Sequence, residues 1–363
     1  MSEAHAKLPP SSAHVWEACT GWPTMMEQVT PQEGLEAQEG TRAHEAAAKV
    51  LSGENAEFES DEMAQAVGMY VTDVLDTAAL HPEDSDLMVE WRVQVPLVHA
   101  ECWGTTDVVL YCPPPVNKLI VWDFKYGHRV VEAFENRQLA TYASGALSHF
   151  KASADCEVIL RIVQPRAFAP GGPIREWKTD AGKIYRITNR LSQSAEAALG
   201  REPLTATGSH CRDCDAITVC QAALDAGMQL YEASSKPVAQ ELSPQSLGVQ
   251  LKLVTRAIKQ LEALRTGYMA QVEALIASGQ NVPGWGIERS VGALAWTIPP
   301  EKVIALGEMF CAALGKPPAP ITPTQAMKII PVAVVKANSD RPIRGNKVVA
   351  MSDDYAKQIF GDL

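Results

Sequence analysis

The strongest constraint on the fold is a pair of apolar, β-rich runs separated by a short proline turn. Residues 104–112, GTTDVVLYC, and residues 118–125, KLIVWDFK, flank the turn PPPVN. Runs rich in β-branched and aromatic residues, bounded by proline and asparagine, are typical of strands joined in a hairpin. The sequence therefore predicts two adjacent antiparallel strands, and the apolar letters LIVW predict that the second strand is buried.

Further elements are predicted on both sides of this hairpin. Residues 87–99 alternate apolar and polar side chains, as in a half-buried strand, and residues 157–165 form a buried apolar run. Four stretches carry helix formers or helical spacing of apolar residues: 34–52, 61–80, 132–150 and 183–199. The order helix, helix, three strands, helix, strand, helix predicts an α/β domain.

The chain is predicted to contain two domains. Residues 234–246, SSKPVAQELSPQS, are typical of a linker, which places one domain at 1–233 and a second, α-rich domain at 247–363. The second domain begins with a long amphipathic helix and contains a small β element around GWGIERSVGALAWTI. It carries no recognisable chemical motif, so the sequence predicts no role for it.

Composition excludes some classes of protein. With 46% hydrophobic and 21% charged residues in 363, the chain is expected to be globular. It has no apolar run of roughly 18 residues and does not start like a signal peptide, so we expect no membrane partner and an intracellular location. A net charge of −11 argues against a simple nucleic-acid coat protein, but a metal-binding carboxylate site is acidic by nature.

Asp123 and Lys125 end the second run of the hairpin, with only Phe124 between them. Side chains alternate across a strand, so the carboxylate and the ammonium project from the same face. If Asp107 of the neighbouring run projects onto that face, two carboxylates meet a cation, which suits Mg²⁺ or Mn²⁺. Such a metal can activate water and stabilise charge on a phosphodiester. The alternative is a surface salt bridge, because Asp-x-Lys alone is a common pattern.

Three residues outside the hairpin could contribute to such a site. His44 lies on the first predicted helix and could supply a further metal ligand. Gln138 and Tyr142 are separated by one helical turn, so they face the same way and could hydrogen-bond a phosphate or a base. Each also has a structural alternative, namely a histidine without a ligand and a Gln-Tyr pair that packs against the sheet.

Three cysteines lie close together in the stretch SHCRDCDAITVCQA. Cys211, Cys214 and Cys220 have the spacing C-x2-C-x5-C, and two thiolates at the first spacing can chelate one metal centre. Tetrahedral zinc sites and iron-sulfur cubanes both need four ligands. The fourth could be the adjacent His210, which would give a zinc site, or the distant Cys19. Free thiols are the remaining alternative.

In order and spacing, GTTD, VWDFKYG and RQLATYA resemble the motifs of the PD-(D/E)xK nuclease superfamily, specifically the RecB-type exonucleases. That family carries Gly-x-x-Asp, then Asp or Glu-x-Lys, then Gln-x-x-x-Tyr, with an upstream helical histidine. The resemblance covers about residues 10–225. It implies an α/β fold with a PD-(D/E)xK restriction-endonuclease-like core, in which helices flank a mixed central sheet, followed here by a C-terminal helical extension.

The resemblance also implies roles for particular residues. The implied Mg²⁺ or Mn²⁺ ligands are His44, Asp107 and Asp123. Lys125 would be the catalytic lysine, acting with the two aspartates, while Gln138 and Tyr142 match the substrate-side motif. Glu90 is a looser match to the acidic residue that such enzymes often carry before the Gly-x-x-Asp strand.

An iron-sulfur staple is a further implication of the resemblance. RecB-type nucleases with such a staple join one N-terminal cysteine to a C-terminal C-x2-C-x5-C trio, with the nuclease motifs between them. The implied ligands of a [4Fe-4S] cluster are Cys19, Cys211, Cys214 and Cys220. Zn²⁺ is the alternative occupant. Either centre would close a loop of nearly the whole nuclease domain and so stabilise it.

The resemblance thus implies a Mg²⁺- or Mn²⁺-dependent deoxyribonuclease, an exonuclease acting on linear duplex ends or single strands of DNA. The wording LPPSSAHVWEAC and the C-terminal helical region also resemble phage and prophage proteins. That implies the cytoplasm of a bacterial host, a role in phage recombination, replication or repair, and a phage single-strand annealing protein as a candidate partner. The alternative is a catalytically inactive nucleic-acid-binding or assembly protein with a structural Fe-S or Zn site.

Overall fold

The computed structural model describes residues 6–30, 35–167, 169, 171–235, 242–291, 294–316, 319–341 and 343–350. Its contacts separate two units, Met1–Ala274 and Leu275–Leu363, which are described one at a time. All of the candidate site residues named above lie in the first unit.

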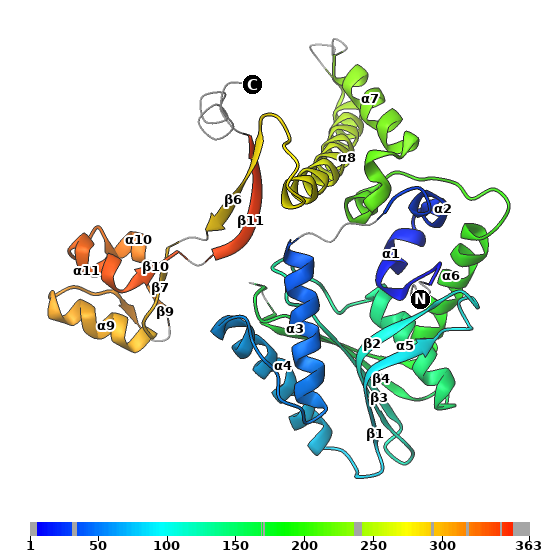
Figure 1. Cartoon of the computed structure of the whole chain (residues 1–363), viewed down its shortest axis with the longest axis horizontal. Helices are drawn as coiled ribbons and strands as arrows, with labels where there is room; N and C mark the ends of the chain where they lie inside the picture. The colour runs from blue at the N-terminus through cyan, green and yellow to red at the C-terminus, as the bar shows by residue number, and fades with distance from the viewer. Residues whose placement is uncertain are drawn as a thin grey trace. The chain divides into compact units, whose positions relative to one another are not determined.

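A five-stranded mixed sheet forms the centre of the first unit (Figure 1). Its strands, in spatial order, are β1 (Asp86–Gln94), β2 (Trp103–Cys112), β3 (Lys118–Phe124), β4 (Glu157–Val163) and β5 (Ile174–Asp180). Only β3 and β4 pair parallel, and the other neighbours pair antiparallel. The predicted hairpin is confirmed as β2 and β3, with Val108 opposite Trp122.

Helices cover both faces of this sheet (Figure 1). The main ones are α3 (Leu35–Leu51), α4 (Asp61–Ala79), α5 (Arg137–His149) and α6 (Ala181–Ala198). Tyr70 of α4 packs in one core with Trp122, whereas Leu139 of α5 and Ile184 of α6 pack in the other core with Val121. Because neighbouring strand residues point to opposite faces, β3 contributes to both cores. The predicted α/β domain with helices flanking a mixed sheet is confirmed at this level.

Capping side chains fix where these helices begin. The α5 helix starts later than the predicted range 132–150, because the Asn136 side chain accepts a hydrogen bond from Leu139 N at 3.1 Å. Asp180 caps α6 in the same way, by accepting from Lys183 N at 2.8 Å. Such caps satisfy backbone N–H groups that have no partner within the helix.

Strand β5 has no counterpart among the predicted strands. It lies at the edge of the sheet, and its sequence IREWKTD is largely polar. Arg175, one of its buried residues, donates hydrogen bonds to Val131 O and Gln164 Oε1. An edge strand with polar inward side chains lacks the apolar alternation from which strands are predicted.

Short helices begin the described chain, and longer ones end the first unit. They are η1 (Pro10–Ser12), α1 (Ala13–Trp16), α2 (Trp22–Met26), η2 (Ser209–Asp213), η3 (Asp215–Thr218), α7 (Gln221–Ser235) and α8 (Pro244–Ala277). The long helix predicted after the linker is confirmed as α8. Within the predicted linker 234–246, residues 236–241 lie outside the described ones. The contacts divide the chain within the last turn of α8 instead, because Ala263 and Leu264 of α8 pack against Ile217.

The second unit mixes short helices and strands. They are β6 (Trp285–Val291), β7 (Ala295–Trp296), α9 (Pro300–Met309), β8 (Gly315–Lys316), β9 (Ala319–Pro320), α10 (Pro323–Ala326), α11 (Val332–Ala337), β10 (Ser339–Asp340) and β11 (Ile343–Ala350). The predicted small β element is confirmed as β6 and β7. The core of the second unit contains Val303, Leu314, Ala326, Ile330 and Val335. Among the described residues of the whole chain, no helix is both long and apolar enough to cross a membrane.

Candidate functional site

Asp123 and Lys125 lie side by side at the end of β3, as the alternation of side chains predicts. Lys125 Nζ is 3.0 Å from Asp123 Oδ2, while Phe124 packs in the core beneath α3 and α4. The backbone N–H of Lys125 donates to Val163 O of β4 at 2.9 Å, so the sheet fixes the position of the lysine backbone. Asp123 is only 3% exposed, which excludes an ordinary surface salt bridge.

Asp107 and His44 adjoin this ion pair. Asp107 Oδ2 accepts a hydrogen bond from the Phe124 N–H at 2.7 Å, which holds the carboxylate of β2 against the end of β3. Its other oxygen, Oδ1, is 3.4 Å from His44 Nδ1. The His44 ring comes from α3 and lies 5.3 Å, between ring centroids, from Phe124. Phe124 therefore positions both groups, one through its backbone and one through its ring.

Three carboxylates form a row across neighbouring strands. The regular pairing of β2 with β3 ends at Val108 and Trp122, and the next residue on each strand is an aspartate, Asp107 on β2 and Asp123 on β3. On the other side of β2, Glu90 of β1 falls opposite Asp107, between two regular pairs. The sheet thus brings together the two predicted aspartates and the more loosely matched glutamate.

The grouping that best fits a cation includes Glu90. One ligand atom from each of His44, Glu90 and Asp107 lies within 4.8 Å of the others. Glu90 reaches this position with a φ of 46°, a left-handed conformation that is uncommon for a non-glycine residue. Asp123 falls outside this group, because its oxygens contact Lys125 and Gln138.

Gln138 bridges the ion pair from the first turn of α5. Its Nε2 donates to Asp123 Oδ1 at 2.9 Å, and its Oε1 accepts from Lys125 Nζ at 3.2 Å. The lysine ammonium is therefore held between two oxygen acceptors. The sequence pattern suggested a contact with substrate for Gln138, whereas here it orients the aspartate and the lysine.

Tyr142 lies one turn further along α5 and packs against β2. A Cβ atom at Gly104 would lie 2.9 Å from Tyr142 Oη and 3.0 Å from Pro10 Cδ. Such distances are below ordinary contact distances, so a side chain at position 104 would force its neighbours to shift. The Gly-x-x-Asp and Gln-x-x-x-Tyr patterns are thus in direct contact, at Gly104 and Tyr142.

The charges of the site stabilise one another. Burial opposes ionisation of Asp107, but His44 and Lys125 hold its pKa below the ordinary value. Burial raises the pKa of Asp123 above the ordinary value, against the attraction of Lys125. Burial would lower the pKa of the Lys125 ammonium, but the two aspartates raise it. The lysine therefore stays a cation at neutral pH.

Glu90 and Tyr142 respond to the same negative charge. Burial, together with repulsion from Asp107, raises the pKa of Glu90 to about 7. The pKa of the Tyr142 hydroxyl is raised far above its ordinary value, first by burial and then by the aspartates. A site that crowds carboxylates so that one takes up a proton near neutral pH is a site where a cation would be favoured.

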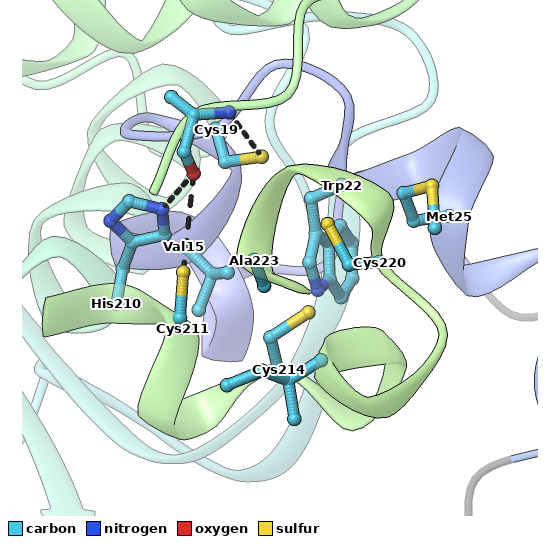
Figure 2. Close-up of a pocket in the computed structure, with 11 residues that line it drawn as sticks. Val15, Cys19, Trp22, Met25, His210, Cys211, Cys214, Cys220 and Ala223 are labelled. Atoms are coloured by element: carbon cyan, nitrogen blue, oxygen red, sulfur yellow. Dashed lines mark hydrogen bonds between the residues drawn. The ribbon is translucent and has the colours of Figure 1, made fainter. Parts of the chain in front are cut away.

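Four cysteines line a single cavity, the cysteine cavity (Figure 2): Cys19, Cys211, Cys214 and Cys220. None of the eight cysteines, all of which are described, forms a disulfide. Trp22, Met25 and Ile217 give the cavity an apolar wall. Burial raises the pKa of the Cys214 thiol to about 12, so a bound cationic centre would be needed to make it a thiolate at neutral pH.

Backbone N–H groups point at two of the sulfurs. Ala206 N donates to Cys19 Sγ at 3.4 Å, and Gly208 N donates to Cys211 Sγ at 3.4 Å. Figure 2 shows the Cys19 sulfur beside the segment that leads to His210. Hydrogen bonds to sulfur are a feature of iron-sulfur ligation, where they tune the cluster.

A single zinc ion fits the cysteine cavity less well than a larger four-thiolate centre. Zinc holds its thiolates at about 2.3 Å, which places the sulfurs roughly 3.8 Å apart. In the described parts of the chain, no group of three potential ligand atoms that includes a cysteine lies within 4.8 Å of one another. His210, the alternative fourth ligand, uses its Nε2 on Ala206 O at 2.9 Å. The four cysteines that line the cavity are therefore not gathered as closely as a single zinc ion would hold them.

Hydrogen bonds also join the N-terminal segment to the segment after α6. Gly21 N donates to Leu204 O at 2.9 Å, and the Thr20 hydroxyl both donates to Leu204 O and accepts from Leu204 N at 3.1 Å. Asp213, the last residue of η2, forms ion pairs with His14 and Arg129. Spacing alone gave no signal for Asp213, since its partners are distant in sequence.

Comparisons with known proteins place the chain in a family. It is similar to the solved structure described as "Crystal structure of SSO0001", with 16% sequence identity and a TM-score of 0.28, over 61% of this chain and 89% of that chain. A family model matches residues 5–297, which span the sheet, the carboxylate row and the four cysteines. The chain therefore belongs to the family described as "Protein of unknown function (DUF2800)".

Proposed function

We propose that this protein is a metal-dependent deoxyribonuclease with a PD-(D/E)xK core of the RecB type, and that it acts as an exonuclease on DNA ends. One observation carries the proposal. A row of three carboxylates meets a half-buried lysine and a histidine at one place in the sheet, although the five residues come from four separate segments. Structural ion pairs rarely require three carboxylates and an imidazole around so few cations.

Three residues would hold the divalent cation. His44, Glu90 and Asp107 supply one imidazole and two carboxylates, a donor set that suits Mn²⁺ and Mg²⁺. Each oxygen of Asp123 keeps a second lone pair beyond its present contact, so Asp123 would serve as a neighbouring ligand. When bound, the cation would activate water and offset the negative charge that develops on a phosphodiester.

The protein groups would do the rest of the work by position. Lys125 Nζ, held between Asp123 and Gln138, would contact a phosphate oxygen and stabilise its charge. Gln138 would hold the Lys125 and Asp123 side chains in fixed positions, which limits the reorganisation needed in the transition state. The depressed pKa of Asp107 keeps that carboxylate ionised and ready to bind a cation.

We further propose that the cysteine cavity holds a [4Fe-4S] cluster. Its support is four free cysteines around one apolar cavity and two N–H groups directed at sulfur. The cluster would join the N-terminal segment to the segment after α6 and would take no part in phosphodiester hydrolysis. Action on DNA ends in phage recombination, beside a single-strand annealing protein, is the corresponding biological proposal.

Cleavage assays with a matched pair of aspartate variants test the enzyme proposal. Asp123→Asn keeps the side-chain shape but removes the charge beside Lys125. Asp73→Asn makes the same change in α4, where Asp73 pairs with Arg161 and Trp122. End-labelled linear DNA is incubated with Mg²⁺ or Mn²⁺, and a covalently closed circle of the same sequence tests the need for an end.

The expected result is degradation of linear DNA by wild type and Asp73→Asn, and a loss of roughly a hundredfold or more in Asp123→Asn. The circle should persist if the enzyme needs an end. Equal cleavage rates for Asp123→Asn and Asp73→Asn would show that Asp123 has no role in catalysis. DNA binding by wild type without any cleavage would support the inactive nucleic-acid-binding protein instead.

A further inference from the structure

Residues 209–220, which carry Cys211, Cys214 and Cys220, are here called the cysteine segment. We propose that a groove between this segment and α8, here called the α8 groove, binds the phosphodiester backbone of a DNA strand. The groove has a volume of about 640 Å³ and is lined by residues of η2 and α8. It lies within the first unit and shares no lining residue with the carboxylate site. The inference rests on the proposed function, because that function supplies DNA as the ligand.

The two walls of the α8 groove are anchored to each other. Ala263 and Leu264 of α8 pack in one apolar cluster with Cys211 and Ile217 of the cysteine segment. The approach is so close that a Cβ at Gly267 would lie 2.1 Å from Ile217 Cγ2. The groove therefore has fixed walls on both sides.

The walls carry an excess of positive charge. Arg212 comes from η2, whereas Lys259 and Arg265 come from α8. Glu262 supplies the one carboxylate. Within the described residues, none of the three cations has a carboxylate oxygen within 4.0 Å, although Arg137 and other arginines of this acidic chain are ion-paired. All three side chains are exposed. Unpaired arginine and lysine side chains in a groove are the groups that bind phosphate oxygens.

The positive charge continues along α8, which favours an extended polyanion over a single small anion. Lys252, Arg256 and Lys259 are spaced i, i+4, i+7, so they share one side of the helix. Seven residues of helix rise about 10 Å, which is longer than one phosphate group. Lys252 and Arg256 are also exposed and, in the described part of the chain, have no ion pair. A nucleic-acid strand presents regularly spaced phosphates to such a track.

Binding measurements on charge-matched variants test this site. Lys259→Gln with Arg265→Gln removes two cations from the α8 groove, and Lys151→Gln with Arg186→Gln removes two exposed cations elsewhere. Both double variants therefore have the same net charge. The probe is a fluorescein-labelled single strand of about 20 nucleotides, longer than the usual site sizes of roughly 4–16 nucleotides, and a duplex of the same sequence. Anisotropy is measured across a salt series without divalent cations, so that no cleavage occurs.

The expected result is a shallower salt dependence for the groove variant only. Each phosphate contact on a single strand contributes about 0.7 to the slope of log affinity against log salt, so two lost contacts should reduce the slope by about 1.4 and weaken binding roughly tenfold. The corresponding reduction on duplex is about 1.8. The probe that shows the reduction identifies the strand state that the groove binds.

Two outcomes would overturn the inference, and they are distinguishable. If wild type cleaves DNA but both double variants bind it with the wild-type slope, the α8 groove is not a DNA site while the nuclease proposal stands. If wild type neither binds nor cleaves either probe, the groove inference and the proposed function fail together. Thermal unfolding curves of both variants, expected to match wild type because the substitutions are exposed, show that any loss is local.

Discussion

At the scale of single residues, the contact between Gly104 and Tyr142 is the most specific feature of the carboxylate site. We predict that Gly104→Ala lowers the free energy of unfolding by about 1–3 kcal/mol, because the new Cβ would lie 2.9 Å from Tyr142 Oη. Adding Tyr142→Phe removes the clashing hydroxyl, so the alanine should cost less in that background. Urea unfolding of the four proteins of this double-mutant cycle gives the coupling energy.

Tyr142→Phe should recover only part of the stability that Gly104→Ala loses, because Pro10 Cδ would still lie 3.0 Å from the alanine Cβ. An alanine cost that is the same with tyrosine and with phenylalanine at 142 would show that the hydroxyl does not set the need for glycine. The sequence pattern named both residues, yet only the structure joins them, because one lies on β2 and the other on α5.

The candidate site was predictable residue by residue to different degrees. Side-chain alternation placed Asp123 beside Lys125 correctly, because period two is a property of any strand. Hairpin register places Asp107 and Asp123 next after the last regular pair of β2 and β3, and that register needed the turn geometry of the structure. Glu90 was named only through a loose match to the family pattern, because its positive φ departs from regular strand geometry.

At the scale of elements, the ion pairs of Asp213 join η2 to α1 and to the segment after β3. We predict that Asp213→Asn lowers the free energy of unfolding at pH 7 by about 1 kcal/mol, a modest value because solvent screens the exposed partners His14 and Arg129. Burial opposes ionisation of Asp213, but these two partners lower its pKa from 3.8 to about 2. Urea unfolding of both proteins over a pH series measures the difference.

The pH dependence has a definite sign. A depressed carboxylate pKa stabilises the fold above the unfolded value of 3.8, and that stabilisation is lost as pH falls toward about 2. Wild type and Asp213→Asn should therefore converge in acid. A constant difference between them down to the lowest pH would mean that the ion pairs do not contribute. In an Arg129→Gln background, Asp213→Asn should lower the free energy of unfolding by less than it does in wild type.

Elements with strong internal periodicity were predictable, and those defined by their neighbours were not. The α3 and α4 helices match their predicted ranges closely, because apolar spacing and an N-terminal Ser60 cap are local signals. Strand β5 escaped prediction because its inward residues Arg175 and Thr179 are polar and find partners or burial only in the assembled sheet. The α8 helix was predicted, but its attachment to the cysteine segment was not.

At the scale of the whole molecule, the four cysteines should act as one clasp between the N-terminal segment and the segment after α6. We predict that Cys19→Ala abolishes the visible absorption of an anaerobically purified protein at about 400 nm, as expected for loss of a [4Fe-4S] cluster. It should also destabilise the first unit by roughly 3–5 kcal/mol, because a loop of nearly two hundred residues is no longer closed. Absorption spectra and thermal unfolding measure the two effects.

Cys102→Ala is the matched control, since Cys102 is fully buried but does not line the cysteine cavity. It should keep the absorption and lose only about 1 kcal/mol from the deleted sulfur. A Cys19→Ala protein that keeps its colour and stability would refute the clasp. A colourless wild-type protein with one bound zinc would show that the cavity holds zinc and not an iron-sulfur cluster. From residues alone the choice between Cys19 and His210 as the fourth ligand stayed open, and the hydrogen bond between His210 Nε2 and Ala206 O could not be foreseen.

The proposed catalytic role of Lys125, at the end of β3, can be tested by comparing two lysines of that strand. Lys125→Ala removes the ammonium held by Asp123 and Gln138, whereas Lys118→Ala removes one at the opposite end, where Lys118 pairs with Glu157. The measurement is the single-turnover rate of Mn²⁺-dependent degradation of end-labelled linear DNA. We predict a wild-type rate for Lys118→Ala and a rate at least about a hundredfold lower for Lys125→Ala. Equal rates in the two variants would contradict it.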